Sequence, residues 1–138
     1  MSGIYVLDAC ALIAVLSNEN GADKVVDVYK KVISGEAKLV MNAVNLLEVY
    51  YDDYRFHGKE AADKMIANVR ALSIEIIIET ADELFFEIGR LKASYKISLA
   101  DSFALAQAKI TGGILLTADH HEFDVIEDKE PIQFLWIR

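Results

Sequence analysis

Four acidic residues, far apart in the sequence, occupy positions from which carboxylates can act together. Asp8 directly follows a short apolar run near the start of the chain, and Asp119 lies two residues beyond the apolar run 114–117. Glu48 and Asp101 fall near the starts of two predicted helices. Carboxylates a few Å apart repel one another strongly unless a cation neutralises them. The set of four therefore predicts a cation site, with Asp8 as its central ligand.

The donor atoms of this set point to a hard divalent ion. Carboxylate oxygens without Cys or His partners suit Mg²⁺ or Mn²⁺ better than Zn²⁺. Such an ion activates water for attack on a phosphodiester and offsets charge on the leaving oxygen, and a pair of ions can share these tasks. The chemistry predicted from the acids is therefore metal-dependent hydrolysis of a phosphodiester bond.

Each acid also has a purely structural interpretation. Glu48 and Asp101 each follow an amide or hydroxyl side chain by three residues, which is the spacing of a helix capping box. Thr80 and Glu83 have the same spacing, and there we predict a helix cap. Taken singly, no acid favours function over structure. The inference depends on all of them sharing one edge of a sheet.

Apolar runs and helical periodicity predict the elements that would position these acids. Short runs without alternation, typical of strands covered on both faces, lie at about 4–8, 39–41, 74–78, 114–117 and 132–137. Helical patterns lie at about 11–16, 22–33, 42–57, 59–72, 80–92 and 98–111. The alternation predicts an α/β fold, a single-domain α/β/α sandwich around a mostly parallel sheet of about five strands. Ligands of such sheets bind beyond the carboxyl ends of the strands, where all four acids would lie.

Length and composition favour one compact domain over residues 1–138. The chain has 138 residues, of which 54% are hydrophobic; this is enough for one core but too short to divide comfortably into two. The single cysteine, Cys10, excludes an internal disulfide and a cysteine-rich zinc site, and it suits a reducing compartment. No apolar run approaches the roughly 20 residues that span a bilayer. We expect a cytoplasmic protein without a membrane partner.

Charge argues against one way of binding nucleic acid. The net charge is −8, from 22 acids against 14 Lys and Arg, so a broad basic face that grips phosphates is not expected. Assigning four acids to a cation site accounts for half of this charge. The bound metal would then supply positive charge locally.

Four motifs are spread over essentially the whole chain: 6–13 (VLDACALI), 45–50 (NLLEVY), 98–102 (SLADS) and 116–119 (LTAD) followed by Phe123. In this order they resemble the PIN domain family, and within it the VapC-like toxins of toxin–antitoxin pairs. The resemblance implies a PIN-like fold and a VapBC-type endoribonuclease toxin that requires Mg²⁺ or Mn²⁺. It also implies an RNA substrate, homodimerisation and inhibition by a cognate VapB-like antitoxin. The implied catalytic and metal-binding acids are Asp8, Glu48, Asp101 and Asp119.

Two positions depart from the pattern of the family. Cys10 stands where many relatives have Ser or Thr, so a hydroxyl that would bond a metal-binding carboxylate is missing and this contact is expected to be weaker. Cys10 as a thiolate nucleophile is disfavoured, because neighbouring Asp8 would oppose the negative charge. Thr117 is a second candidate to support the carboxylates. His120 and His121 follow Asp119 where relatives vary, and we interpret them as exposed loop residues.

The densest basic stretch is a candidate RNA contact. Lys92 and Lys96 flank Tyr95 shortly before Asp101, so the lysines would steer phosphates while the tyrosine stacks on a base. An ordinary helix end with favourable cations explains the same residues equally well.

Two other classes of protein remain as alternatives. A catalytically silent PIN-like module would bind a partner protein and no metal, although the complete set of four acids argues against it. A receiver-like phosphoacceptor domain is the least favoured, because the predicted strand 74–78 ends without an acceptor Asp.

Overall fold

The computed structural model describes residues 3–138, which form a five-stranded sheet between two layers of helices. All strand pairs are parallel, in the order β3-β2-β1-β4-β5. The strands are β1 (Gly3–Leu7), β2 (Ala37–Asn42), β3 (Glu75–Ile77), β4 (Ile114–Thr117) and β5 (Gln133–Trp136). The predicted α/β/α fold is confirmed, and its sheet is entirely parallel.

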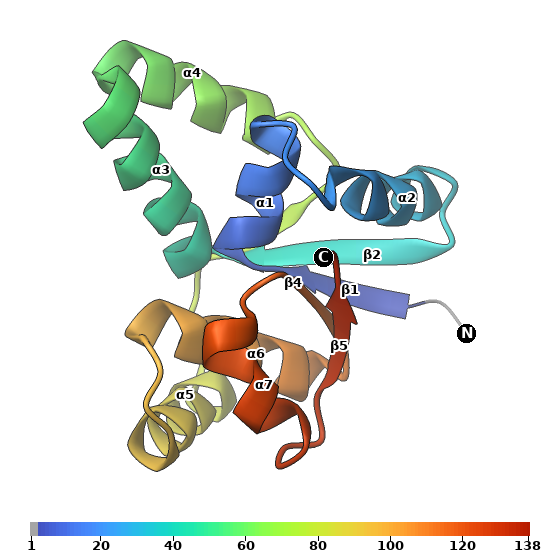
Figure 1. The fold of residues 1–138 in the computed structure, drawn as a ribbon, viewed down its shortest axis with the longest axis vertical. Coiled ribbons are helices and arrows are strands. Elements are labelled where there is room, and N and C mark those ends of the chain that lie inside the picture. The colour runs from blue at the N-terminus through green and yellow to red at the C-terminus, as the bar shows by residue number, and fades with distance from the viewer. Residues whose placement is uncertain (1–2) are drawn as a thin grey trace.

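The helices divide between the two faces of the sheet, as Figure 1 shows. One face carries α1 (Ala9–Leu16), α2 (Ala22–Ile33), α3 (Ala43–His57) and α4 (Lys59–Arg70). The other carries α5 (Asp82–Ser94), α6 (Leu99–Thr111) and α7 (His120–Glu127). No helix among residues 3–138 is long and apolar enough to span a membrane.

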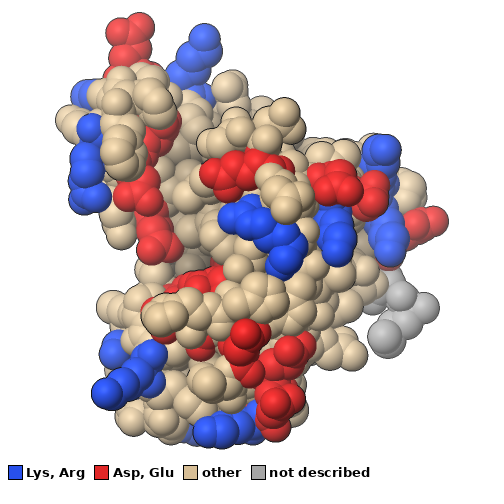
Figure 2. All heavy atoms as spheres, in the orientation of Figure 1, with Lys and Arg blue, Asp and Glu red and all other residues tan. Residues whose placement is uncertain are grey.

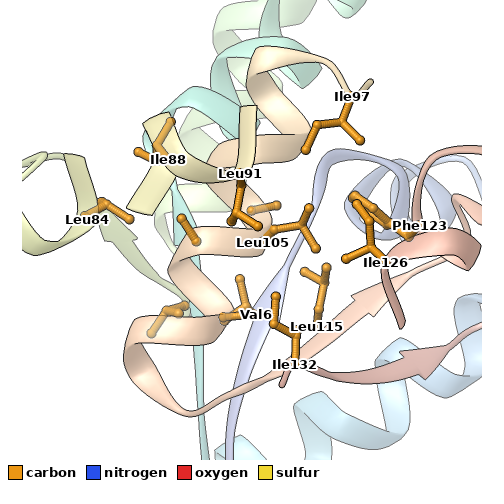
Figure 3. Packing of buried hydrophobic residues seen from close by; sticks show 14 residues of the cluster. Val6, Leu84, Ile88, Leu91, Ile97, Leu105, Leu115, Phe123, Ile126 and Ile132 are labelled. Atoms are coloured by element: carbon orange, nitrogen blue, oxygen red, sulfur yellow. The ribbon is translucent and has the colours of Figure 1, made fainter. Parts of the chain in front are cut away.

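Burial on both faces explains why the strands lack polar alternation. Val6 and Leu115 point into the core beneath α5, α6 and α7, where Figure 3 shows them facing Leu105. Their neighbours Leu7 and Leu116 point into the core on the α1 side. Successive strand residues therefore both bury apolar side chains, each in a different core.

The starts of α3 and α6 test whether Glu48 and Asp101 belong to helix capping boxes. The Asn42 side chain accepts a hydrogen bond from the Val44 N–H and begins α3, so Asn45 lies inside the helix. The capping alternative for Glu48 is therefore wrong. Ser98 caps α6, and its hydroxyl accepts a hydrogen bond from the Asp101 N–H at 3.1 Å. This confirms the Ser98 half of the predicted capping box.

Two local predictions were wrong in the second half of the chain. Helix α5 begins at Asp82 after Ala81, with no side-chain cap, so the predicted Thr80 cap does not form. The phase of α5 is set instead by the buried Leu84, Ile88 and Leu91. Helix α7 was not predicted, because it has only eight residues and buries only Phe123 and Ile126. His120 and His121 are exposed as expected, but they lie in this helix and not in a loop.

Candidate active site

An acidic cavity of about 340 Å³ lies at the carboxyl ends of β1 and β4. The strand order reverses between these two strands, which is where parallel α/β sheets place their ligands. In Figure 2 this face is hollowed beside α3, and Asp and Glu side chains border the hollow. The acids that line the cavity are Asp8, Glu48, Asp52, Asp101, Asp119 and Glu122. The structure thus brings the four predicted acids to one place.

Asp8 is held by the first turn of α1. Its carboxylate accepts the Ala11 N–H at 2.9 Å and so caps the helix, while the side chain is almost completely buried. Burial raises the pKa of Asp8 to about 6, opposed by contacts with Thr117, Ala11 and Cys10. Asp8 is therefore a fixed carboxylate in a position that disfavours its own charge.

Cys10 makes the contact for which a hydroxyl was expected. Its Sγ lies 3.2 and 3.3 Å from the two carboxylate oxygens of Asp8 and 3.6 Å from the Thr117 hydroxyl. The Ala118 N–H donates to the same sulfur at 3.3 Å. Burial, together with the charge of Asp8, raises the pKa of the thiol to about 12. Cys10 is therefore a protonated donor to Asp8 and no nucleophile.

Asp119 is fixed by residues on both sides of it. The Asp119 N–H donates to the Thr117 hydroxyl at 3.0 Å, and the Asp119 carboxylate accepts the Glu122 N–H at 3.2 Å, which caps α7. Thr117 is completely buried at the end of β4. Thr117 therefore contacts both Cys10 and Asp119, on the two sides of the cavity.

Asp101 lies in the first turn of α6. Burial raises its pKa to about 7, with further contributions from the charges of Asp119, Asp8 and Glu122, while a hydrogen bond with Ser98 lowers it. The carboxyl group is therefore partly protonated at neutral pH. This is the expected behaviour of an acid that faces other acids with no cation between them.

Glu48 faces the cavity from α3. Burial is the main cause that raises its pKa, and the charges of Asp52, Asp8 and Asp119 act in the same direction. Asp52 lies one helical turn after Glu48, and Glu122 follows Asp119 by three residues. Sequence reasoning missed both, although these spacings place each on the same helix face as a predicted acid.

Asn45 links the two helices that carry Glu48 and Asp101. Its side-chain amide donates to the Ala100 carbonyl at 2.9 Å, while its Oδ1 atom is buried without a hydrogen-bond partner in this part of the chain. The contact ties α3 to the first turn of α6. It therefore sets the distance between the two acids.

The donor set fits a hard divalent cation. Among residues 3–138, no side chain lining the cavity is a Lys, Arg or His, so the acids have no counter-charge there. Within the same residues, no three His, Cys, Asp or Glu side chains stand close enough to hold an ion together as they are. Mg²⁺ usually retains several waters and needs only one or two direct carboxylates. An open acidic cavity of this size suits such partly hydrated binding.

The predicted RNA contacts do not line the cavity. Lys92 and Lys96 are exposed at and beyond the end of α5. Tyr95 packs against the core, and its hydroxyl donates to Glu130 at 2.6 Å. Its position favours the structural interpretation of this tyrosine over base stacking.

Comparison with known proteins agrees with this fold. Residues 5–129 match the PIN domain family, and the chain belongs to this family. No curated protein matches the sequence.

Solved structures show the same fold at low sequence identity. The chain is similar to VapBC2 from Rickettsia felis bound to a promoter DNA fragment, with a TM-score of 0.75, 16% identity, and coverage of 96% of this chain and 97% of the other. For DNA-bound VapBC from Salmonella typhimurium the TM-score is 0.74 at 12% identity, with 99% of both chains covered. For VapC20 from Mycobacterium tuberculosis, a toxin that cleaves the sarcin-ricin loop, it is 0.61 at 12% identity, covering 80% and 86%.

Proposed function

We propose that this PIN domain is a metal-dependent endoribonuclease and the toxin of a VapBC-type pair. The observation that carries the proposal is the cavity that Asp8, Glu48, Asp101 and Asp119 line together, with no Lys, Arg or His among the described side chains of its lining. Its fold is shared with VapC20, which is described as cleaving the sarcin-ricin loop. Family and site together favour hydrolysis of an RNA phosphodiester.

In this proposal the four acids hold Mg²⁺ or Mn²⁺, which supplies an activated water and offsets charge on the leaving oxygen. Asp8 keeps one orientation, because the Ala11 N–H and the Cys10 thiol fix its oxygens. Asp101 is partly protonated near neutral pH, and it releases this proton when a cation binds to the carboxylate. Asn45 and Ser98 position the acids and take no part in the chemistry.

The proposed partners follow from the same comparisons. VapBC complexes among the structural relatives support a VapB-like antitoxin as the partner that inhibits this chain. A second copy of this chain is proposed from the resemblance to VapC-like toxins. The proposed substrate is cytoplasmic RNA. The exposed Lys92 and Lys96 steer the phosphates of this RNA towards the acids. Tyr95 is not included as a stacking residue.

The test is cleavage of single-stranded RNA with Mg²⁺ or Mn²⁺ by the wild type, Asp8→Asn and Asp101→Asn. We expect each variant to lose at least about 100-fold in activity, since even residues that only orient metal ligands cost 10- to 100-fold. Asp27→Asn, an exposed acid on α2, is the matched control and should cleave like the wild type. Unchanged cleavage by folded Asp8→Asn and Asp101→Asn would disprove the proposal.

The second candidate is a catalytically silent PIN-like module that binds a partner protein. It is favoured by one observation, the absence among residues 3–138 of three ligands already close enough for a metal. Titration with Mn²⁺ separates the two candidates. The ribonuclease should bind Mn²⁺ and melt at a higher temperature with it, whereas the silent module should show neither effect.

A further inference from the structure

Three aromatic rings form a continuous stack beside the acidic cavity. The imidazole of His120 stacks on the indole of Trp136, with centroids 3.8 Å apart and planes within 13°. Trp136 in turn stacks on Phe134 at 5.4 Å and 8°. The indole N–H donates to Glu127 at 3.1 Å, which fixes the middle ring. The stack is thus held in place, and His120 is its terminal ring.

The outer face of His120 is open. Its Nδ1 lies 2.8 Å from an Asp124 carboxylate oxygen, and its Nε2 lies 2.9 Å from the Arg138 carbonyl oxygen. Both edges of the ring are therefore occupied, and Trp136 covers one of its faces. The side chain is nevertheless 49% exposed. The exposed surface must belong largely to the ring face opposite Trp136.

This open face lies at the same edge of the sheet as the cavity. His120 is the first residue of α7 and directly follows Asp119, whose side chain lines the cavity. Trp136 ends β5, and β5 pairs with β4, the strand that leads to Asp119. His120 does not itself line the cavity, so the base it can meet is that of a nucleotide next to the one whose phosphate reaches the acids.

The composition of the cavity indicates what the open face of His120 could contribute to RNA binding. Among residues 3–138 no Lys, Arg or His lines the cavity, so the side chains there provide no positive charge that would bind RNA apart from a bound cation. Stacking of a base on an aromatic ring provides affinity without charge, and it tolerates any base because every base has a π-face. Single-stranded RNA exposes bases for such contacts.

We propose that His120 is the stacking platform for one base of the RNA, the base that flanks the scissile phosphodiester. The inference rests on the proposed ribonuclease function. Trp136 and Phe134 are positioning residues that hold the platform parallel to the incoming base.

The first experiment separates the ring of His120 from its hydrogen bonds. His120→Phe keeps a ring and loses both bonds, whereas His120→Gln keeps polar atoms and loses the ring. We expect KM for single-stranded RNA to rise about 5- to 150-fold in His120→Gln, the range for one stacked base, and to stay near the wild-type value in His120→Phe. His121→Ala, the exposed neighbour without a stack, should match the wild type. Equal KM in all four proteins would overturn the inference.

The second experiment tests the base itself. An RNA with an abasic residue beside the cut should raise KM for the wild type and leave KM for His120→Gln unchanged. A merely structural role of His120 predicts the same abasic penalty in both proteins, and that result would overturn the inference.

A measurement of RNA binding tests the inference even if the wild type cleaves no RNA. Trp136 is the only tryptophan and lies under the platform, so a short single-stranded RNA added without metal should change its fluorescence in the wild type and His120→Phe. His120→Gln should need a several-fold higher RNA concentration for the same change. An absence of cleavage with this pattern would refute only the ribonuclease, whereas identical titrations would refute the platform.

Discussion

At the scale of single residues, Asp8 combines two properties that oppose each other. Its carboxylate caps α1 and accepts a thiol hydrogen bond, both of which favour its charge, yet it is buried at the edge of a cavity of acids. Desolvation dominates, and the pKa rises from an ordinary 3.8 to about 6. The metal-free protein therefore carries a destabilising charge at neutral pH, which a bound cation would relieve.

The first prediction concerns the stability of the metal-free protein against pH. The pKa values of Asp8 and Asp101 are raised to about 6 and 7 in the folded chain. Above about pH 4 the folded chain therefore keeps protons on these acids that the unfolded chain has already released. The stabilisation from these protons is complete below about pH 4 and is lost as the pH rises through 6 and 7. We expect urea denaturation to show a fall in unfolding free energy of roughly 1 to 3 kcal/mol between pH 5 and 7.5.

The variant Asp101→Asn provides the control for this measurement. It lacks one of the two groups and should show a smaller fall, while His120, whose pKa is also raised, acts equally in both proteins. Mn²⁺ should restore stability more at pH 7.5 than at pH 5. A metal-free protein that becomes more stable from pH 5 to 7.5 would contradict the prediction.

At the scale of elements, a charged cluster joins α5, α6 and the segment before β5. The half-buried carboxylate of Glu130 contacts Arg90 at 2.6 Å, the Tyr95 hydroxyl at 2.6 Å and Lys109 at 3.6 Å. Arg90 also pairs with Glu87 at 2.7 Å. Arg90 and Tyr95, against opposing burial, keep the pKa of Glu130 below its ordinary value. This cluster fixes the turn that leads from α5 to Ser98 and Asp101.

The second prediction removes the central charge of this cluster. Glu130→Gln keeps the size of the side chain but leaves the partners of this half-buried carboxylate incompletely bonded, which should cost roughly 1 to 3 kcal/mol of unfolding free energy. The matched control is Glu79→Gln, exposed before α5, with an expected change within about 0.5 kcal/mol. Denaturation of both variants in parallel measures the difference, and equal stabilities would show that the cluster contributes nothing.

The elements were largely predictable because parallel strands bury both faces. Each of the five apolar runs proved to be a strand, since a run of this kind needs no tertiary information to be recognised. Helix α7 was missed because its two buried residues are too few for a periodic pattern. The cap at Thr80 was wrong because packing of α5, and not local spacing, decides where that helix begins.

The candidate site was predictable only in part. Asp8 and Asp119 could be placed because they follow strands, and their edge of the sheet is fixed by the parallel order. Asp52 and Glu122 were missed because an acid one turn further along a helix is usually a solvated residue. The contact of Cys10 with Asp8 and the stack of His120 on Trp136 depend on how tightly elements pack, which local spacing does not reveal.

At the scale of the whole molecule, apolar side chains remain exposed around the edge strand β3. Leu47 on α3 is 55% exposed and Ile78 after β3 is 78% exposed, and both line one cavity of about 660 Å³. A contiguous exposed apolar surface of this kind typically marks a protein interface. We expect it to bind a second copy of this chain, as the resemblance to VapC-like toxins implies.

The third prediction follows from this surface. Sedimentation at micromolar concentration should give a dimer for the wild type and a monomer for the double variant Leu47→Asp and Ile78→Asp. Val125→Asp, a residue of α7 that is 60% exposed, is the control and should remain dimeric. A double variant that stays dimeric would place the interface elsewhere, and a monomeric wild type would refute the dimer.

The position of β1 at the centre of the sheet also orders events during synthesis of the chain. Asp8 and Glu48 belong to the part translated first, but β1 receives its second neighbour only when β4 pairs with it, and Asp119 follows β4. A nascent chain that has not reached this point carries half of the acids on an unfinished sheet. With the proposed ribonuclease activity, this order would delay cleavage until the whole sheet has been made.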